Sequence, residues 1–262
     1  MFKRKKLIIP GAALIAMICL AVFVRQQYVL PILMYHSVSR VVLNGNALTV
    51  SVDTFEKQME FLKRNHYTVL PLDSAADYAN GKKNVFSRAV ALTFDDGNKD
   101  NYTYAYPILK KYGFSATIFI IVSEVGKPGR LNWQEIKEMQ DSGLISFGSH
   151  TLTHCFLDSL QSKNEIEQEI RGSKQELEAK LGKKVNSFSY PMGRFTPISL
   201  QAVKDAGYKA AVATNPGYRF PSRDIFALKR LRISENARDM FIFWFESSGY
   251  YNFIREIRQH KK

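Results

Sequence analysis

The sequence predicts a parallel α/β fold, either a (β/α) barrel or a doubly wound sheet, preceded by one N-terminal transmembrane helix. Short continuous apolar runs recur along the chain, and amphipathic helical patterns lie between them. Such runs are typical of parallel strands buried on both faces, and their alternation with helices along the chain is typical of βα units. The 262 residues, 45% of them hydrophobic, show no internal repeat and suffice for one catalytic-size domain.

The N-terminal segment predicts a signal anchor. Residues 1–6 are mostly basic, and residues 7–24 carry no charge and are just long enough to span a bilayer. The apolar run ends in VFVRQQY rather than in a small-residue cleavage site, so we expect it to stay uncleaved. Because the basic residues precede the run, the positive-inside tendency predicts a single-pass protein of the cell membrane with its folded domain outside.

Five regions follow from these patterns. They are a cytoplasmic basic segment (1–6), a transmembrane signal anchor (7–24), a juxtamembrane segment with the first strand and its loop (25–50), the α/β domain (31–236) and a basic aromatic tail (237–262). Without the five basic residues up to Arg25, the formal net charge of +13 falls to about +8, which is diffuse and favours anionic surfaces such as wall polymers. The expected location disfavours nucleic acid, and the sequence has no basic-aromatic recognition motif.

Eight apolar runs are the expected strands. They cover residues 31–35, 68–72, 89–94, 116–122, 144–149, 187–191, 210–214 and 226–233. Residues 54–65 and 164–182 have apolar side chains at helical spacing, and we expect these stripes to face the core. Gly182 is expected to cap the second of these helices, and residues 41–51 are expected to form a loop.

Two short motifs carry the chemistry, each directly after an expected strand. Asp95 and Asp96 follow residues 89–94, and His150 and His154 follow residues 144–149. In parallel folds the functional groups gather at the carboxyl ends of strands. If residues 150–154 wind into a helical turn, both imidazoles face one ion, although such a pair alone can be structural, as can an Asp-Gly turn.

Together the two motifs predict a hydrolytic metal site. One carboxylate and two imidazoles leave coordination positions open for water and substrate, and the second carboxylate is then available as a base. The spacing does not decide which of Asp95 and Asp96 plays which role.

The two motifs resemble those of a known family. TFDDG (93–97) and SHTLTH (149–154) are similar to the first and second motifs of the polysaccharide deacetylases of carbohydrate esterase family 4, which share the NodB homology domain. The resemblance covers residues 31–235 and implies a distorted (β/α) barrel of about seven strands. It also implies hydrolysis of N-acetyl groups on a GlcNAc-containing cell-wall polysaccharide or exopolysaccharide.

The resemblance assigns roles to the four residues. It implies that Asp96, His150 and His154 hold a divalent metal and that Asp95 is the general base. Zinc is the expected ion, and this ligand set also suits other divalent transition metals.

Further site residues come from one branch of the family. SFSYPMGR (187–194) resembles the third motif of the biofilm poly-N-acetylglucosamine deacetylases, where a backbone N–H next to the Tyr position stabilises the oxyanion. Because Pro191 has no N–H, the N–H of Tyr190 is the expected donor, and simple strand-end packing of Tyr190 is the alternative. Arg230 or Arg232, near the last strand end, is expected to orient Asp95.

The expected acid is His36. Many family members carry a general-acid His near the C-terminus, but here only His260 follows His154. LMYHSV instead places His36 after the first strand, which a barrel would bring beside the last one. This resembles the circularly permuted arrangement of the biofilm branch and implies that His36 protonates the leaving amine. The alternative is that His36 only caps a strand. Asn98 departs from the branch, which often has an aromatic residue there.

Two other functions stay open at this point. The barrel could be a catalytically silent module that binds glycans or assists wall assembly, although the complete set of Asp95, Asp96, His150 and His154 argues against this. An amidase or esterase acting on another acyl substrate would use the same metal chemistry, and the weak third motif leaves room for it.

Overall fold

The computed structural model describes residues 8–26, 28–43, 45–79, 88–214 and 224–251. Its contacts divide the chain into two units, Met1–Val29 with Gly249–Lys262, and Leu30–Ser248, which we describe separately. The predicted basic segment (1–6) and the last part of the predicted tail (252–262) lie outside the described residues.

The first unit contains helix α1 (Ile8–Gln26), where an apolar helix was expected. Beyond α1, the backbone N–H of Val29 donates to the carbonyl of Gly249 at 3.0 Å, and the rings of Tyr28 and Tyr250 meet edge to face at 5.7 Å. Among the described residues, no helix is long and apolar enough to cross a membrane.

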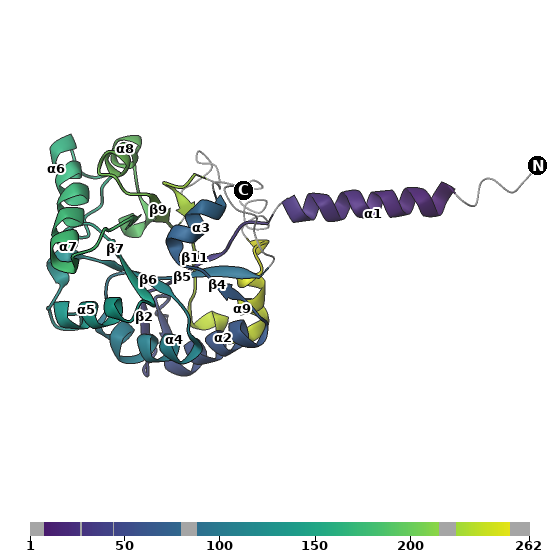
Figure 1. Cartoon of the computed structure of the whole chain (residues 1–262), viewed down its shortest axis with the longest axis horizontal. Helices are drawn as coiled ribbons and strands as arrows, with labels where there is room; N and C mark the ends of the chain where they lie inside the picture. The colour runs from purple at the N-terminus through teal and green to yellow at the C-terminus, as the bar shows by residue number, and fades with distance from the viewer. Residues whose placement is uncertain (1–7, 27, 44, 80–87, 215–223, 252–262) are drawn as a thin grey trace, which may run out of the picture. The chain divides into compact units, whose positions relative to one another are not determined.

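The second unit is a parallel barrel (Figure 1). Its strands are, in their order around the ring, β1 (Ile32–Tyr35), β5 (Ala89–Phe94), β6 (Ala116–Ile120), β7 (Ile145–Ser149), β8 (Ser187–Ser189), β9 (Ala210–Ala213), β10 (Leu228–Lys229) and β11 (Leu231–Arg232). The strands β10 and β11 are two halves of one extended segment around Arg230. One half pairs with β9 and the other with β1, so this segment completes a seven-stranded ring and confirms the predicted barrel.

Two parts of the strand prediction were wrong. The apolar run 68–72 forms only β4 (Thr68–Val69), which pairs with the first residues of β5 and lies off the ring. The last residues of the segment expected to be a loop (41–51) form β3 (Thr49–Ser51), which pairs in parallel with β2 (Ser37–Ser39), just before that segment. This sheet forms because Val38 and Val50 are both fully buried.

Helices surround the ring (Figure 1). They are α2 (Val52–Arg64), α3 (Leu72–Ala79), α4 (Tyr106–Tyr112), α5 (Trp133–Asp141), α6 (Lys163–Glu167), α7 (Ser173–Leu181), α8 (Pro197–Asp205) and α9 (Met240–Ser247). Short 3-10 or π segments are η1 (Asn101–Ala105), η2 (Val122–Glu124), η3 (Gln168–Gly172), η4 (Pro191–Gly193) and η5 (Glu235–Arg238). The predicted helices correspond to α2 and to the run α6–η3–α7, which ends at Gly182 with a left-handed φ of 63°. Helix α9, within the predicted tail, buries Phe243 against Phe61 at 5.8 Å.

Packing between β6 and β7 inside the barrel supports the side chain of Arg230. Phe119 of β6 is fully buried and lies in register with Gly148 of β7. A Cβ atom on Gly148 would lie 2.5 Å from the Phe119 ring, so only glycine leaves room for this ring. The guanidinium carbon of Arg230 lies 5.5 Å from the centre of the same ring.

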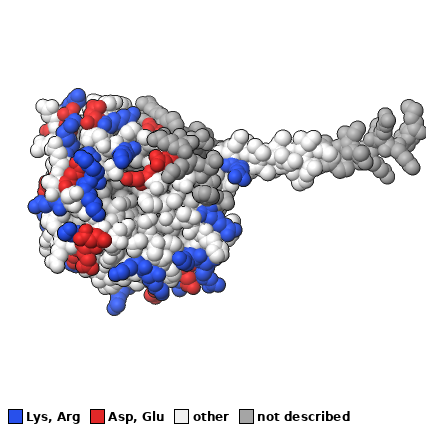
Figure 2. Space-filling model, viewed as in Figure 1, with Lys and Arg blue, Asp and Glu red and all other residues white. Residues whose placement is uncertain are grey.

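Charged side chains are scattered over the visible face of the barrel (Figure 2). On the face shown in Figure 2, basic and acidic groups are interspersed and do not form one basic patch. This distribution agrees with the diffuse charge excess expected from the sequence.

Candidate functional site

The turn after β5 presents the two aspartates at the carboxyl end of the barrel. The N–H of Asp95 donates to the carbonyl of Tyr35 at 3.0 Å, which extends the pairing of β5 with β1 by one residue. Asp96 and Gly97 then adopt left-handed φ values of 71° and 64°. A Cβ atom on Gly97 would lie 2.8 Å from a methyl carbon of Ile120, and the left-handed φ also favours glycine at this position. The turn leaves Asp95 buried and Asp96 partly exposed.

Asp95 is paired with Arg230 inside the barrel. The guanidinium donates to both carboxylate oxygens, Nη1 to Oδ1 at 2.7 Å and Nη2 to Oδ2 at 2.6 Å. Burial by itself would raise the pKa of Asp95, but the charges of Arg230 and His150 outweigh burial and hold that pKa well below its usual range. Asp95 is therefore an ionised, oriented carboxylate.

Of the two arginines expected to orient Asp95, the structure selects Arg230. Its side chain is almost fully buried, whereas Arg232 is exposed two residues farther along the segment. Burial is the main cause of the lowered pKa of His36, and the positive charges of Arg230 and Arg232 both add to it.

His150 and His154 converge without a helix, contrary to the expected helical turn. The segment after β7 is irregular because Thr151 and His154 have left-handed φ values of 66° and 63°. Hydroxyl groups stabilise it: the N–H of Thr151 donates to Ser149 Oγ at 3.2 Å, and the N–H of His154 donates to Thr151 Oγ1 at 2.9 Å. The carboxylate of Glu169, from η3, accepts the next two backbone N–H groups, those of residues 152 and 153.

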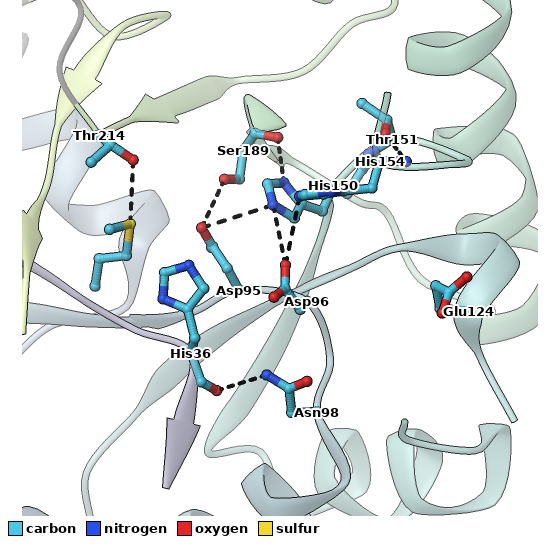
Figure 3. A network of polar contacts seen from close by, with 12 residues as sticks. His36, Asp95, Asp96, Asn98, Glu124, His150, Thr151, His154, Ser189 and Thr214 are labelled. Atoms are coloured by element: carbon cyan, nitrogen blue, oxygen red, sulfur yellow. Dashed lines mark hydrogen bonds and ion pairs between the residues drawn. The ribbon is translucent and has the colours of Figure 1, made fainter. Parts of the chain in front are cut away.

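Asp96, His150 and His154 together have the geometry of a metal site (Figure 3). The Oδ1 atom of Asp96 lies 3.6 Å from Nε2 of His150 and 3.7 Å from Nε2 of His154. Three ligands about 2.1 Å from a tetrahedral ion would be about 3.4 Å apart, so the donor atoms present fit a transition metal.

The protonation of His150 also fits a metal ligand. Its Nδ1 lies 2.7 Å from the carbonyl oxygen of Ser189, which can only accept a hydrogen bond, so Nδ1 carries the proton and Nε2 keeps a lone pair. Burial lowers the pKa of His150 and outweighs the charges of Asp95 and Asp96, which favours the neutral imidazole.

His36 lies beside the two aspartates. It follows β1, which pairs with β5 on one side and with β11 on the other, as expected for a barrel. Burial lowers the pKa of His36, and the opposing charges of Asp95 and Asp96 act to raise it. Its buried Nδ1 has no hydrogen-bond partner within the part of the chain that the structure describes. Figure 3 shows its ring on the side of Asp95 away from His154.

Tyr190 does not fit its expected role. Its backbone N–H donates to the carbonyl of Val212 at 3.1 Å, so the sheet already uses this donor. Its side chain is fully buried, and its hydroxyl donates to the carbonyl of Phe226 at 3.1 Å. The structure supports the alternative interpretation, in which Tyr190 packs at the strand end.

Ser189 was not predicted from the sequence, yet it contacts both Arg230, the partner of Asp95, and His150. Its hydroxyl accepts from Nη2 of Arg230 at 2.9 Å, and its carbonyl fixes the ring of His150. The signal in the sequence is weak: a small polar residue stands between Phe188 and Tyr190 in an otherwise apolar strand end.

Comparisons with known proteins agree with this site. A family model described as polysaccharide deacetylase matches residues 82–211. YxkH of Bacillus subtilis strain 168, which carries the polysaccharide deacetylase name, is 38% identical over 205 residues, covering 78% of this chain and 71% of that protein. The poly-beta-1,6-N-acetyl-D-glucosamine N-deacetylase of Staphylococcus aureus strain N315 is 31% identical over 207 residues, covering 74% and 71%.

Two solved structures share the fold over most of this chain. The deacetylase PplD of Streptococcus pyogenes, in complex with acetate, has a TM-score of 0.74 at 31% identity and covers 81% of this chain and 96% of its own. IcaB from Ammonifex degensii has a TM-score of 0.73 at 26% identity and covers 84% and 97%.

Proposed function

Because this chain belongs to the polysaccharide deacetylase family, we propose that it hydrolyses the N-acetyl groups of a polysaccharide containing N-acetylglucosamine. The products would be acetate and a glucosamine unit. The relative from Staphylococcus aureus is named for poly-β-1,6-N-acetylglucosamine, which supports an exopolysaccharide of this kind. A cell-wall polymer that carries the same acetamide is equally compatible with the site.

Asp96, His150 and His154 are the proposed ligands of a divalent metal, with zinc expected and other transition metals compatible. When bound, such an ion polarises a carbonyl oxygen and lowers the pKa of a coordinated water toward about 7. The observation that supports this proposal is the convergence of one carboxylate oxygen and two imidazole nitrogens, with Ser189 fixing the tautomer of His150.

Asp95 is the proposed general base. Arg230 keeps its carboxylate ionised and fixes the direction of its oxygens. Oδ2 of Asp95 lies 3.9 Å from Nε2 of His150, next to the proposed metal ligands. A carboxylate with a lowered pKa is a weak base, so its contribution depends on orientation and on the acidity of the water that it deprotonates.

His36 is the proposed general acid. Its ring faces the same space as Asp95 and Asp96, and it would donate a proton to the nitrogen of the departing amine. Burial lowers the pKa of His36, whereas the charges of Asp95 and Asp96 favour its protonated form, which is the form that can donate the proton.

The proposed function depends on one observation: Asp96, His150 and His154 converge beside the carboxylate of Asp95, which Arg230 orients. Acetate release tests the proposal. We expect the purified full chain to release acetate from poly-β-1,6-N-acetylglucosamine, peptidoglycan or chitin oligomers, to lose this activity with a chelator, and to regain it with Zn²⁺. A metal-loaded chain that releases no acetate from any of these polymers would contradict the proposal. Binding without release would instead indicate a silent glycan-binding module.

The proposed location is the outer side of the cell membrane, with residues 7–24 as the anchor. The uncharged run and the basic residues before it support this location. Membrane fractionation of cells and N-terminal sequencing of the mature chain test it. A mature N-terminus near Gln26 would show that the segment is cleaved.

A further inference from the structure

The side chain of Asn98 lies between His36, the proposed acid, and the turn that contains Asp96, a proposed metal ligand. Its amide nitrogen donates to the carbonyl of His36 at 3.2 Å, and its amide oxygen accepts from Nη1 of Arg130 at 2.6 Å. The same Nη1 donates to the backbone carbonyl of Asp96 at 3.3 Å. The end of β1 and the turn after β5 are thus joined through Asn98 and Arg130. Figure 3 shows the hydrogen bond from Asn98 to the carbonyl of His36.

The neighbouring backbone keeps Asn98 in this position. Asn98 and Arg130 form an isolated antiparallel bridge, and the N–H of Leu131 donates to the carbonyl of Gly97 at 2.9 Å. Nε of Arg130 also lies 3.6 Å from the carboxylate of Glu124, which holds the guanidinium in place. Asn98 forms both of its hydrogen bonds in the absence of substrate. Because its side chain is already ordered, substrate binding costs little further side-chain entropy at this position.

The carbonyl of His36 receives a second amide. Nδ2 of Asn101 donates to it at 2.8 Å, and Asn101 is fully buried. Asn101 therefore belongs to the core, whereas Asn98 is only half-buried and can be changed with less risk to the fold. Phenylalanine at position 98 could form neither of the hydrogen bonds that Asn98 makes.

We propose that Asn98 is a positioning residue that sets the place of His36 relative to the Asp96 turn through its hydrogen bonds to the carbonyl of His36 and to Arg130. The proposal rests on the proposed role of His36 as general acid. Asn98 contacts neither reacting atoms nor metal ligand atoms in this arrangement. Its effect should therefore appear in turnover and not in metal binding.

Steady-state kinetics of the metal-loaded full chain test the proposal. Loss of one hydrogen bond that positions the acid should lower kcat about tenfold in Asn98→Ala, with KM changed less than about twofold. Asn98→Asp should show a similar loss, because it keeps an acceptor for Arg130 but cannot donate to His36. Asn65→Ala is the matched control, since it removes an amide-to-carbonyl hydrogen bond at the end of α2, and it should leave kcat unchanged.

Combining the variants shows whether Asn98 acts through His36. In a His36→Ala background, Asn98→Ala should lower the residual kcat by less than about twofold, because its effect depends on the imidazole. Three results would overturn the proposal: a kcat like that of the wild type, loss of bound metal in Asn98→Ala, or the same fold-loss in both backgrounds.

A second measurement does not depend on activity. The chain has five histidines, so their ring resonances can be resolved by selective labelling and assigned with His36→Ala. Asn98→Ala should shift the ring resonances of His36 and leave those of His66 in place. If the wild-type chain releases no acetate, the proposed function fails and this spectrum alone decides the role of Asn98. An unshifted His36 would overturn it.

Discussion

Arg230 and Asp95 form a buried ion pair that serves both stability and the proposed chemistry. Each partner is almost fully buried, and the two side chains share two short hydrogen bonds, with Ser189 accepting a third from the guanidinium. Removing an isolated charge from water is costly, so each of these groups is tolerated in the barrel only because the other is present. The pair also holds Asp95 in the ionised form that a base requires.

Replacing Arg230 tests this dependence. We expect Arg230→Met to lower the free energy of unfolding by about 3–5 kcal/mol, because Asp95 is left buried without a counter-charge. Denaturant unfolding at pH 7 measures the loss. The double variant Asp95→Asn, Arg230→Met should regain much of the stability and remain inactive. A double variant as unstable as the single one would show that the packing of Arg230, and not its charge, is what matters.

Among the secondary-structure elements, strands β6 and β7 support the guanidinium of Arg230. Phe119 of β6 fills the space left by Gly148 of β7, and Arg230 lies over the Phe119 ring. A displacement of the ring would move the guanidinium and with it the carboxylate of Asp95. The packing of two strands therefore determines the orientation of a residue on a third.

Gly148→Ala should disturb this packing. The added methyl group would overlap the Phe119 ring, and we expect a loss of about 1–3 kcal/mol in the free energy of unfolding. Denaturant titration measures this loss, and acetate release should fall with it because Arg230 shifts. Phe119→Leu in the same chain provides space and should restore part of the stability. An unchanged unfolding midpoint in Gly148→Ala would contradict the proposed support.

The whole barrel depends on its last strand segment. Residues on both sides of Arg230 pair with β9 and with β1, so one short segment closes the ring. The same segment carries Arg230 to Asp95, across a sequence separation of 135 residues. The segment that pairs with both β9 and β1 thus also supplies Arg230 to the site, and we expect local changes there to appear in the unfolding of the entire barrel.

Glu178 makes acid stability a test of this cooperativity. Burial acts to raise the pKa of Glu178, but the hydrogen bond from the N–H of Val185 and the contact with Lys174 outweigh it and lower that pKa. The ionised form therefore stabilises the folded chain. This contribution is complete above the unfolded pKa of about 4.3 and is lost as the pH falls through the lowered folded pKa.

We expect Glu178→Gln to be about 1 kcal/mol less stable at pH 7 and to lose less stability than the wild type between about pH 5 and pH 3. Denaturant unfolding across this pH range measures both effects. Glu176→Gln, on an exposed position of the same helix, is the control. If Glu178→Gln and the control behave alike at every pH, the helix and the segment before β8 are not coupled through this carboxylate.

Much of the site could be predicted because the relevant patterns are local. A buried strand is a short apolar run, and Asp95, Asp96, His150 and His154 each stand within a few residues of such a run. Parallel strands bring their carboxyl ends to one edge of a barrel, so these residues had to lie near one another. The place of His36 beside the last strand follows from the same rule, given a closed ring.

Long-range packing decided the remaining features. Three features depend on which strands are neighbours and on their register. They are the pairing of Asp95 with Arg230 rather than Arg232, the contacts of Ser189, and the hydrogen bond from the Tyr190 N–H to Val212. The left-handed backbone at Thr151 and His154 likewise depends on Glu169, from a later helical segment. Short-range spacing indicates which residues stand at a strand end, but hydrogen bonds between segments far apart in the chain determine where each side chain points.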